Sequence, residues 1–316
     1  MKYFTTVHDV SDPQVLVDEA LQLKKNPFEF SSLGKNKTLG LIFFNSSLRT
    51  RLSTQKAAMN LGMQVIVMNI GTEGWTLEYE DGSIMNTSSV EHVKDAAAVV
   101  GLYCDVIAVR CFPSLVNRTD DYSEKIMLQF MKYSKKPIIS LESATLHPLQ
   151  SLADVMTIKE LKKTDKPKIV LTWAPHIKPL PQVVANSFSE WVLNLNYDLT
   201  IVQPKGYELC NDYTRGATIE YDQQLALQNA DFVYVKNWSS YSDYGNVARG
   251  NEDWMLTKQK LEVTNQAKIM HCLPVRRNLE LADELLDGEN SLVLNQAENR
   301  IYAAQIVLKK IVESNR

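Results

Sequence analysis

The chain has 316 residues, of which 45% are hydrophobic and 22% are charged, so it is long enough to form two domains with substantial cores. Its 34 Lys and Arg residues nearly balance its 37 Asp and Glu residues, and the net charge of −3 offers no general attraction to nucleic acid or acidic membranes. No uninterrupted apolar run approaches membrane-spanning length, and the N-terminal segment lacks an apolar signal core. We therefore expect a cytoplasmic protein that binds neither membranes nor nucleic acid.

Eight short apolar and β-branched runs follow one another along the chain and predict strands. Most are continuously apolar, which is typical of strands buried on both faces of a parallel sheet. The segments between them carry apolar residues at helical spacing, so the order of elements indicates the α/β class with right-handed crossovers. The expected strands cover residues 38–44, 63–70, 104–112, 136–143, 168–174, 197–203, 231–237 and 267–274.

The spacing of these strands predicts two doubly wound parallel-sheet domains. Four strands end by residue 143 and four begin at 168, with a helix-like segment and a polar stretch between them. We expect a first domain over 1–145 and a second over 146–295, with a C-terminal helix over 296–316 that packs back on the first. The polar, glycine-bearing segment 71–90 predicts a long loop, and loops of this length inside compact domains are often functional.

The four cysteines are widely spaced and form neither CxxC pairs nor zinc-type spacings with histidine. We interpret them as buried free thiols in a reducing compartment, and we expect no metal site. They are Cys104, Cys111, Cys210 and Cys272.

The segment FFNSSLRTR (43–51) stands between an expected strand and a helical run. Its three polar residues at 45–47 are suitable helix N-caps, so free backbone N–H groups should cluster beside Arg49 and Thr50. The helix dipole, the amides, the hydroxyl and the guanidinium favour the same anion, which predicts a phosphate site. A capped surface helix with solvated arginines is the alternative. Neither GxxxxGK[ST] nor GxGxxG occurs, which argues against a Walker loop and a dinucleotide site.

Three further segments place polar side chains at the ends of expected strands. His147 and Gln150, in LHPLQSLAD, stand where a strand gives way to a helix, so a loop can present both to a crevice. Histidine can polarise a carbonyl and glutamine can bind a planar amide, although a His-Pro pair is more often a turn. In MHCLPVRRN, His271 and Cys272 would point to opposite faces of a strand, which disfavours a Cys–His nucleophile pair. Arg110 ends the third strand and adds a cation at the same edge.

Four motifs together resemble the aspartate and ornithine carbamoyltransferase family. SSLRTR, HPLQSLAD, HCLP and QAENR occur in the order found in these enzymes, and EHVKDAAAVVG resembles a further segment of the family. The resemblance extends over nearly the whole chain. It implies transfer of a carbamoyl group from carbamoyl phosphate to an amine, without a cofactor, in the crevice between the two domains. It also implies a homotrimer whose active sites are shared between subunits.

The resemblance also assigns the donor site. Arg110, His147 and Thr50 would be catalytic, acting on the phosphate and the carbonyl oxygen, and Gln150 would hold the carbamoyl NH2 group. Trp75, in the long loop, would close over the donor site of a neighbouring subunit. The implied carbamoyl-phosphate-binding residues are Ser47, Leu48, Arg49, Thr50, Trp75, Arg110, His147, Gln150, Cys272, Leu273 and Arg300.

The acceptor segment departs from the pattern of the ornithine enzymes. Those carry Asp-x-Trp followed by Ser-Met-Gly, and the aspartate binds the α-ammonium of ornithine, whereas VKNWSSYSDYG (235–245) has Lys236 at that place. A lysine would repel an ammonium group and suits an acyl oxygen or a carboxylate, although a solvated strand-end lysine is the alternative. The pattern resembles the acetylornithine and succinylornithine branch of the family. That branch implies an acyl-ornithine site formed by Glu142, His176, Lys236, Arg276, Asn186 and Val90.

Val90 bears on the identity of the acyl group. Acetyl-type enzymes carry a glutamate near this position, and a glutamate would repel the extra carboxylate of a succinyl group whereas a valine would not. This favours N-succinyl-L-ornithine as acceptor, with N-succinyl-L-citrulline and phosphate as products, in arginine biosynthesis. Succinyl-type enzymes carry a proline there, so Val90 matches neither type. Glu280 stands where acetyl-type enzymes have a lysine subject to carboxylation, so it could supply a permanent carboxylate, or be a solvated helix residue.

Three alternatives remain open at this point. Two are carbamoyltransferases with another acceptor, either N-acetyl-L-ornithine or ornithine. The third is a non-catalytic anion-binding module on the same fold, because a fold does not determine a function. The joint presence of phosphate, carbonyl and amide ligands argues against the third.

Overall fold

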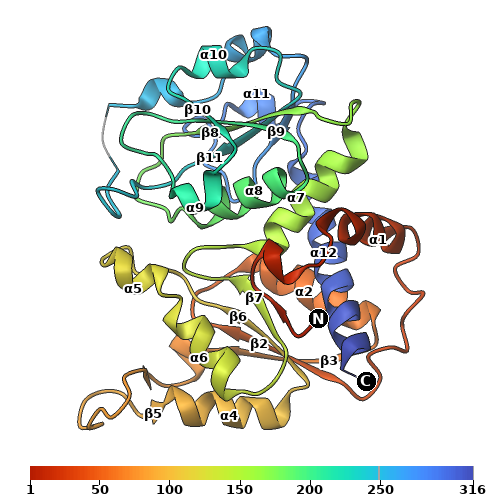
Figure 1. The fold of residues 1–316 in the computed structure, drawn as a ribbon, viewed down its shortest axis with the longest axis vertical. Coiled ribbons are helices and arrows are strands. Elements are labelled where there is room, and N and C mark those ends of the chain that lie inside the picture. Colours follow the sequence, from red (N-terminus) through yellow and green to blue (C-terminus); the bar gives the residue numbers. More distant parts are fainter. Residues whose placement is uncertain (248–249, 316) are drawn as a thin grey trace.

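The structure is a computed structural model that describes residues 1–247 and 250–315, and Figure 1 shows two lobes stacked along the longest axis. Each lobe contains a five-stranded sheet in which all neighbouring strands run parallel. The first sheet has the order β1-β7-β6-β2-β3 and the second the order β10-β9-β8-β11-β12. The expected α/β class with two parallel sheets is therefore confirmed.

The strands of the first sheet are β1 (Tyr3–Phe4), β2 (Thr38–Phe43), β3 (Gln64–Asn69), β6 (Val106–Arg110) and β7 (Ile138–Glu142). Those of the second are β8 (Lys168–Trp173), β9 (Asp198–Val202), β10 (Thr218–Glu220), β11 (Phe232–Lys236) and β12 (Lys268–Met270). A separate short ladder joins β4 (Leu77–Glu78) to β5 (Glu91–His92). All eight predicted strands are present. The four that the sequence analysis missed have two or three residues each, too few to show a period.

The first lobe and the region between the lobes contain α1 (Pro13–Lys25), α2 (Leu48–Asn60), α3 (Ile70–Glu73), α4 (Val93–Tyr103), α5 (Arg118–Tyr122), α6 (Lys125–Tyr133), α7 (Pro148–Leu161) and α12 (Val293–Ser314). The second lobe contains α8 (Val183–Asn194), α9 (Asn211–Thr214), α10 (Gln223–Leu227) and α11 (Asp283–Leu286). Short 3-10 turns cover Val7–Asp9, Glu252–Trp254 and Gln259–Val263.

Helix α7 connects the two lobes and is buried on every side over residues 148–158. It begins with Pro148 in its first turn, a position where the missing N–H of proline costs no helical hydrogen bond. It contacts β7 of the first lobe, α8 of the second and α12, which in turn packs against α1 and α2. The C-terminal helix thus starts at Val293, three residues before the expected 296, and packs beside the first lobe. The boundary at 145/146 stays a prediction, since α7 contacts both lobes.

Candidate active site

A cavity of about 760 Å³ lies between the two lobes. Its walls come from the loops that follow β2, β6 and β7 in the first lobe and β8, β11 and β12 in the second, completed by α7 and α12. Ligands of open parallel sheets bind at the carboxyl ends of the strands, and here two such edges face one crevice. Of the seventeen residues predicted for the site, fourteen line this cavity: Ser47, Leu48, Arg49, Thr50, Arg110, Glu142, His147, Gln150, His176, Lys236, Cys272, Leu273, Arg276 and Arg300.

The first turn of α2 forms one end of the cavity. Ser47, one of the three candidate N-caps in the sequence, is the N-cap, and its Oγ accepts a hydrogen bond from the Thr50 amide at 3.3 Å. Amides at the start of a helix have no partner within the helix and, together with the dipole, favour an anion. The buried Nε of Arg49, at the same end, has no hydrogen-bond partner among the described residues. This end of the cavity therefore has the donors that a phosphate group requires.

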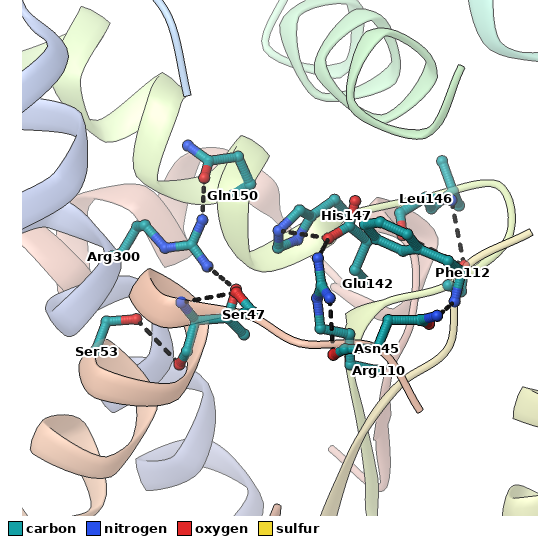
Figure 2. A network of polar contacts seen from close by, with 12 residues as sticks. Asn45, Ser47, Ser53, Arg110, Phe112, Glu142, Leu146, His147, Gln150 and Arg300 are labelled. Carbon is teal, nitrogen blue, oxygen red and sulfur yellow. Dashed lines mark hydrogen bonds and ion pairs between the residues drawn. The ribbon is translucent and has the colours of Figure 1, made fainter. Parts of the chain in front are cut away.

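Arg300 of α12 connects this helix start with α7 (Figure 2). Its Nη2 donates to Oγ1 of Thr50 at 2.5 Å, and its Nη1 donates to Oε1 of Gln150. Gln150 in turn donates from Nε2 to Oδ1 of Asp154 at 2.7 Å. Burial lowers the pKa of Arg300, but a guanidinium remains charged at any physiological pH. A single cation thus holds a hydroxyl and an amide side by side at the cavity wall.

Arg110 is held from two sides at the end of β6 (Figure 2). Its Nη1 donates to the carbonyl oxygens of Asn45 at 2.9 Å and Ser46 at 2.6 Å. Its Nη2 donates to Oε2 of Glu142 at 2.9 Å, and Nε2 of His147 lies 3.5 Å from the same oxygen. Burial raises the pKa of Glu142, and the charge of Arg110 opposes this effect. The guanidinium is therefore fixed in the wall before any ligand binds.

His147 is a buried, neutral imidazole. Burial lowers its pKa well below the usual value, and the charges of Arg300 and Arg110 lower it further. A neutral imidazole carries one N–H donor and no net charge. Set between two guanidiniums, such a donor can stabilise negative charge that develops on a carbonyl oxygen.

The second lobe supplies cations to the opposite wall. Lys236, at the end of β11, is 8% exposed, and its ammonium has no hydrogen bond or ion pair within the described residues. Nε of Arg276 donates to Nε2 of His176 at 3.0 Å, while Nδ1 of His176 lies 2.7 Å from the carbonyl oxygen of Lys178. Burial lowers the pKa of His176, and these partners place its single proton on Nδ1.

The cavity carries a strong excess of positive charge. Counted over residues 1–247 and 250–315, six cationic side chains line it, against one carboxylate. The cations are Arg49, Arg110, Lys178, Lys236, Arg276 and Arg300, and the carboxylate is Glu142. A cleft lined by one sign of charge concentrates ligands of the other sign. The cavity is thus suited to small ligands with several negative charges.

Three predicted residues lie away from this cavity. Asn186 is fully buried in α8, where its Nδ2 donates to the carbonyl oxygen of Thr145 at 3.3 Å. Trp75 and Val90 flank the β4–β5 ladder, which projects from the lower lobe in Figure 1, and are 54% and 65% exposed. Trp75 donates from Nε1 to Oε2 of Glu91 at 2.8 Å. The chain does not bring Trp75 or Val90 to its own cavity.

The loop after β12 differs from the expectation. Because β12 ends at Met270 and not at the expected residue 274, His271 and Cys272 lie in the loop after the strand and strand alternation does not apply to them; of the two, only Cys272 lines the cavity. Nδ1 of His271 accepts the Leu273 amide at 3.0 Å, and its Nε2 lies 3.5 Å from Oε1 of Glu280. Glu280 is 1% exposed and accepts the Arg276 amide at 2.7 Å. Glu280 is thus a buried residue that stabilises this loop through its contacts with His271 and Arg276, and it is not solvated.

The cysteines are all free, but only Cys104 and Cys111 are buried. Cys210 and Cys272 are half-buried, so the expectation of four buried thiols was wrong for these two. In the described part of the chain, His, Cys, Asp and Glu side chains do not gather in threes in a way that could hold a metal ion. The helices found there are all too short or too polar to cross a membrane.

A group of buried residues beneath Gln150 escaped the sequence analysis. Asp154 accepts hydrogen bonds from Gln150, from Nε2 of Gln296 at 2.7 Å and from the hydroxyl of Tyr234 at 3.1 Å. Asp154 ends the motif HPLQSLAD, and its distance of four residues from Gln150 places both on one face of α7. This four-residue spacing was the one feature of the sequence that could have predicted the contact between Gln150 and Asp154.

Known proteins match this chain in sequence. The carbamoyl-P binding domain of the aspartate/ornithine carbamoyltransferases matches residues 2–160, and their Asp/Orn binding domain matches residues 181–311. The chain belongs to the aspartate/ornithine carbamoyltransferase family. Among similar members of this family, the N-succinylornithine carbamoyltransferases of Bacteroides thetaiotaomicron and Bacteroides fragilis are each 49% identical, with 99% of both chains covered. The N-acetylornithine carbamoyltransferase of Xanthomonas campestris is 32% identical over 100% of this chain and 99% of its own.

Solved carbamoyltransferase structures agree with the fold. Acetylornithine transcarbamylase complexed with acetylcitrulline superimposes with a TM-score of 0.92 at 31% identity, covering 98% of this chain and 99% of that one. A variant of N-acetyl-L-ornithine transcarbamylase complexed with carbamyl phosphate and N-succinyl-L-norvaline gives a TM-score of 0.93 at 31% identity, with 98% and 100% covered. The sequence motifs, the fold and the cavity therefore all point to the same family.

Proposed function

We propose that the chain transfers the carbamoyl group of carbamoyl phosphate to the side-chain amine of N-succinyl-L-ornithine, giving N-succinyl-L-citrulline and phosphate. The observation that carries this proposal is the cavity with six cationic side chains and one carboxylate. The donor brings a phosphate, and the acceptor brings both an α-carboxylate and a succinyl carboxylate. This is more negative charge than N-acetyl-L-ornithine or ornithine would bring.

In the proposed reaction, the neutral amine attacks the carbonyl carbon and the bond from that carbon to the phosphate oxygen breaks. The start of α2 and Arg49 would hold the phosphate, with Thr50 and Arg300 beside it. Negative charge that forms on the carbonyl oxygen would be stabilised by Arg110 and by neutral His147, and preorganised donors of this kind typically contribute about 3–4 kcal/mol each. The leaving phosphate accepts the amine proton, so the step balances with the chain supplying only electrostatic stabilisation and position.

The acceptor would bind against the second lobe. Lys236 is a nearly buried cation without a partner among the described residues, so an anion that reaches it gains a charge-assisted hydrogen bond in a low-dielectric site. Arg276, oriented by His176, would bind the second carboxylate, while Glu142 would meet the attacking amine. Free ornithine would bring an ammonium group towards Lys236, which is repulsive.

The choice of succinyl over acetyl is supported by two relatives and by Val90. The Bacteroides proteins at 49% identity carry the N-succinylornithine name, against 32% for an N-acetylornithine enzyme. N-acetyl-L-ornithine transcarbamylase variants with one glutamate replaced by alanine, proline, valine or serine have been solved with N-succinyl-L-norvaline bound. By the family resemblance, Val90 stands near a glutamate of the acetyl-type enzymes. An uncharged side chain there would leave room for a carboxylate.

A homotrimer with shared sites is part of the proposal. Trp75 and Val90 are exposed on a projecting segment and would reach the cavity of a neighbouring subunit. Exposed apolar side chains on α2 and on the adjoining edge strand β3 offer a surface for that neighbour. They are Leu52, Met59, Ile66 and Met68. We also place the enzyme in the cytoplasm, in arginine biosynthesis.

Turnover tests the proposal directly. Purified protein incubated with carbamoyl phosphate and N-succinyl-L-ornithine should release phosphate and N-succinyl-L-citrulline in equal amounts. An anion-binding module without catalytic activity would bind phosphate at the start of α2 but leave both substrates unchanged. Phosphate binding without citrulline formation would therefore reject the enzyme and favour the module.

A further inference from the structure

Asp154 is the common acceptor of three side chains from three elements. It lies in α7 and is fully buried, whereas Gln296 belongs to α12 and Tyr234 to β11 of the second lobe. Nε2 of Gln150 and Nε2 of Gln296 both lie 2.7 Å from its Oδ1, and the Tyr234 hydroxyl lies 3.1 Å from its Oδ2. An ionised carboxylate only accepts hydrogen bonds, so each partner must present a donor to it.

Because Asp154 only accepts hydrogen bonds, it determines which end of the Gln150 side-chain amide faces it. The NH2 end faces the carboxylate, and the carbonyl end then faces Arg300 and the cavity. An amide that turned over would set a carbonyl oxygen against Asp154 and its NH2 group against the Arg300 guanidinium, losing both bonds. The carbonyl oxygen of Gln150 therefore lies on the cavity side, where its remaining lone pair can accept a hydrogen bond from a ligand.

The same carboxylate sets the polarity of a second amide. Gln296 presents its NH2 end to Asp154, so its Oε1 faces the other way and accepts the His271 amide at 2.9 Å. His271 in turn accepts the Leu273 amide, which places the loop that lines the acceptor side of the cavity. Asp154 thus positions residues on both walls of the cavity, through Gln150 on one side and Gln296 on the other.

We infer that Asp154 is a positioning residue that selects the donor: it forces Gln150 to present a carbonyl oxygen, which recognises the NH2 group of a carbamoyl donor and rejects the CH3 group of an acetyl donor. The inference rests on the proposed function, because it names what the donor site distinguishes. A purely structural Asp154 would join α7, α12 and β11 without favouring either donor. Only the positioning role predicts that a change at Asp154 alters the ratio of the affinity for a carbamoyl donor to the affinity for an acetyl donor.

Two stable phosphonates measure that ratio. Phosphonoacetamide and acetonylphosphonate differ only in NH2 against CH3, and isothermal titration calorimetry on the full-length protein gives both Kd values without turnover. The wild type should bind phosphonoacetamide about tenfold more tightly, as one additional hydrogen bond in a buried site allows. Asp154→Asn, in which residue 154 can also donate, should reduce this preference to about twofold or less. An unchanged tenfold preference in Asp154→Asn would overturn the inference.

Matched variants separate the positioning role from general damage. Gln150→Ala should remove the preference by itself, and adding Asp154→Asn to it should change nothing further if Asp154 acts through Gln150. An additional change in the double variant would contradict that route. Glu160→Gln, also on α7 and bonded to Asn299 of α12, should keep the wild-type ratio. If Asp154→Asn does not fold, Asp154→Ser gives a group that can donate or accept, and the same loss of preference is expected.

The outcome is separable from that of the proposed function. If the wild type produces N-succinyl-L-citrulline and the Asp154→Asn variant still prefers phosphonoacetamide tenfold, the proposed function stands and the positioning role of Asp154 is refuted. If the wild type prefers phosphonoacetamide but does not turn over the substrates, the proposed function is refuted, and the Asp154→Asn variant still tests the role of Asp154.

Discussion

The Arg110 guanidinium and the Glu142 carboxylate lie 2.9 Å apart, and both side chains are about nine-tenths buried. Each compensates the other for the loss of water, since an unpaired buried charge is strongly destabilising. Two backbone carbonyls accept hydrogen bonds from Nη1 of Arg110, so the guanidinium is held without a ligand, while its buried Nε has no hydrogen-bond partner among the described residues. A cation that is already in place when negative charge develops needs no reorganisation during the reaction.

Arg110→Ala should therefore lower kcat by about 10²–10³-fold, the range found when one preorganised donor to an oxyanion is removed. Steady-state kinetics with saturating acceptor measures this. Arg277→Ala is the matched control, because Arg277 is half exposed and paired with Asp283 and Asp287 on the surface. Equal losses in the two variants would show that Arg110 acts on the fold and not on the reaction.

Lys236→Gln should weaken the acceptor and leave the donor unaffected. Loss of one charge-assisted hydrogen bond corresponds to about a 10–100-fold fall in kcat/KM for N-succinyl-L-ornithine. The Kd of phosphonoacetamide should stay within about twofold, because Lys236 lies on the opposite wall. Lys205→Gln, at an exposed loop position, serves as the control and should match the wild type. A wild-type kcat/KM in Lys236→Gln would show that this lysine does not contact the acceptor.

Mixing inactive subunits tests whether sites are shared. If Trp75 serves the neighbouring subunit, each site takes Arg110 from one subunit and Trp75 from the next. A trimer made only of Trp75→Ala subunits or only of Arg110→Ala subunits then has one damaged half in every site. Random hybrid trimers of the two should recover roughly a quarter of wild-type activity, because only sites built from two intact halves work. The recovery is measured after co-expression and purification of the hybrids. If Trp75 served its own subunit, every hybrid site would contain one damaged half and activity would stay at the level of the single variants.

Asp154 gives the stability of the protein a pH dependence of definite sign. Burial raises the pKa of Asp154 from 3.8 to about 6, so between these two pH values the folded state holds a proton that the unfolded state has released, and above pH 6 Asp154 is an ionised carboxylate in both states. The stabilisation from this proton is complete below pH 3.8 and is lost as the pH rises through 6. Relative to Asp154→Asn, wild-type protein should lose on the order of 1 kcal/mol of unfolding free energy between about pH 5 and 7.5.

Urea unfolding of both proteins at each pH gives this difference, and taking it as a difference cancels the other titrating groups. Those groups include His147, whose lowered pKa acts with the opposite sign, because it destabilises the folded state as the pH falls. A difference that does not change with pH would mean that Asp154 has an ordinary pKa in the folded protein.

Much of this architecture is visible in the sequence, for identifiable reasons. β2, β6, β7, β8 and β11 are buried at nearly every position, so each leaves a continuous apolar run that needs no period to be recognised. Residues at or after the ends of such runs lie at the carboxyl edge of a parallel sheet, which is why the strand pattern predicts that Arg110 and His147 share one crevice, whereas Lys236 was expected there from the family resemblance.

The buried polar network could not be predicted in the same way. Asp154, Gln296 and Tyr234 come from three elements far apart in the chain, and no local pattern states that they share one acceptor. Their environment depends on how α7 packs between the lobes, and a helix buried on every side has no polar face to show its orientation. Likewise, the exposure of Trp75 depends on the short β4–β5 ladder, whose two-residue strands leave no periodic trace.

The acceptor preference tests the central claim most directly. Wild-type protein is assayed with carbamoyl phosphate and, in parallel, with N-succinyl-L-ornithine, N-acetyl-L-ornithine and L-ornithine, and the three kcat/KM values are compared. A cavity built for an acceptor with two carboxylates predicts the highest value for N-succinyl-L-ornithine and the lowest for ornithine, whose ammonium would face Lys236. A highest value for free ornithine would contradict the role assigned to Lys236 and, with it, the acyl-ornithine site.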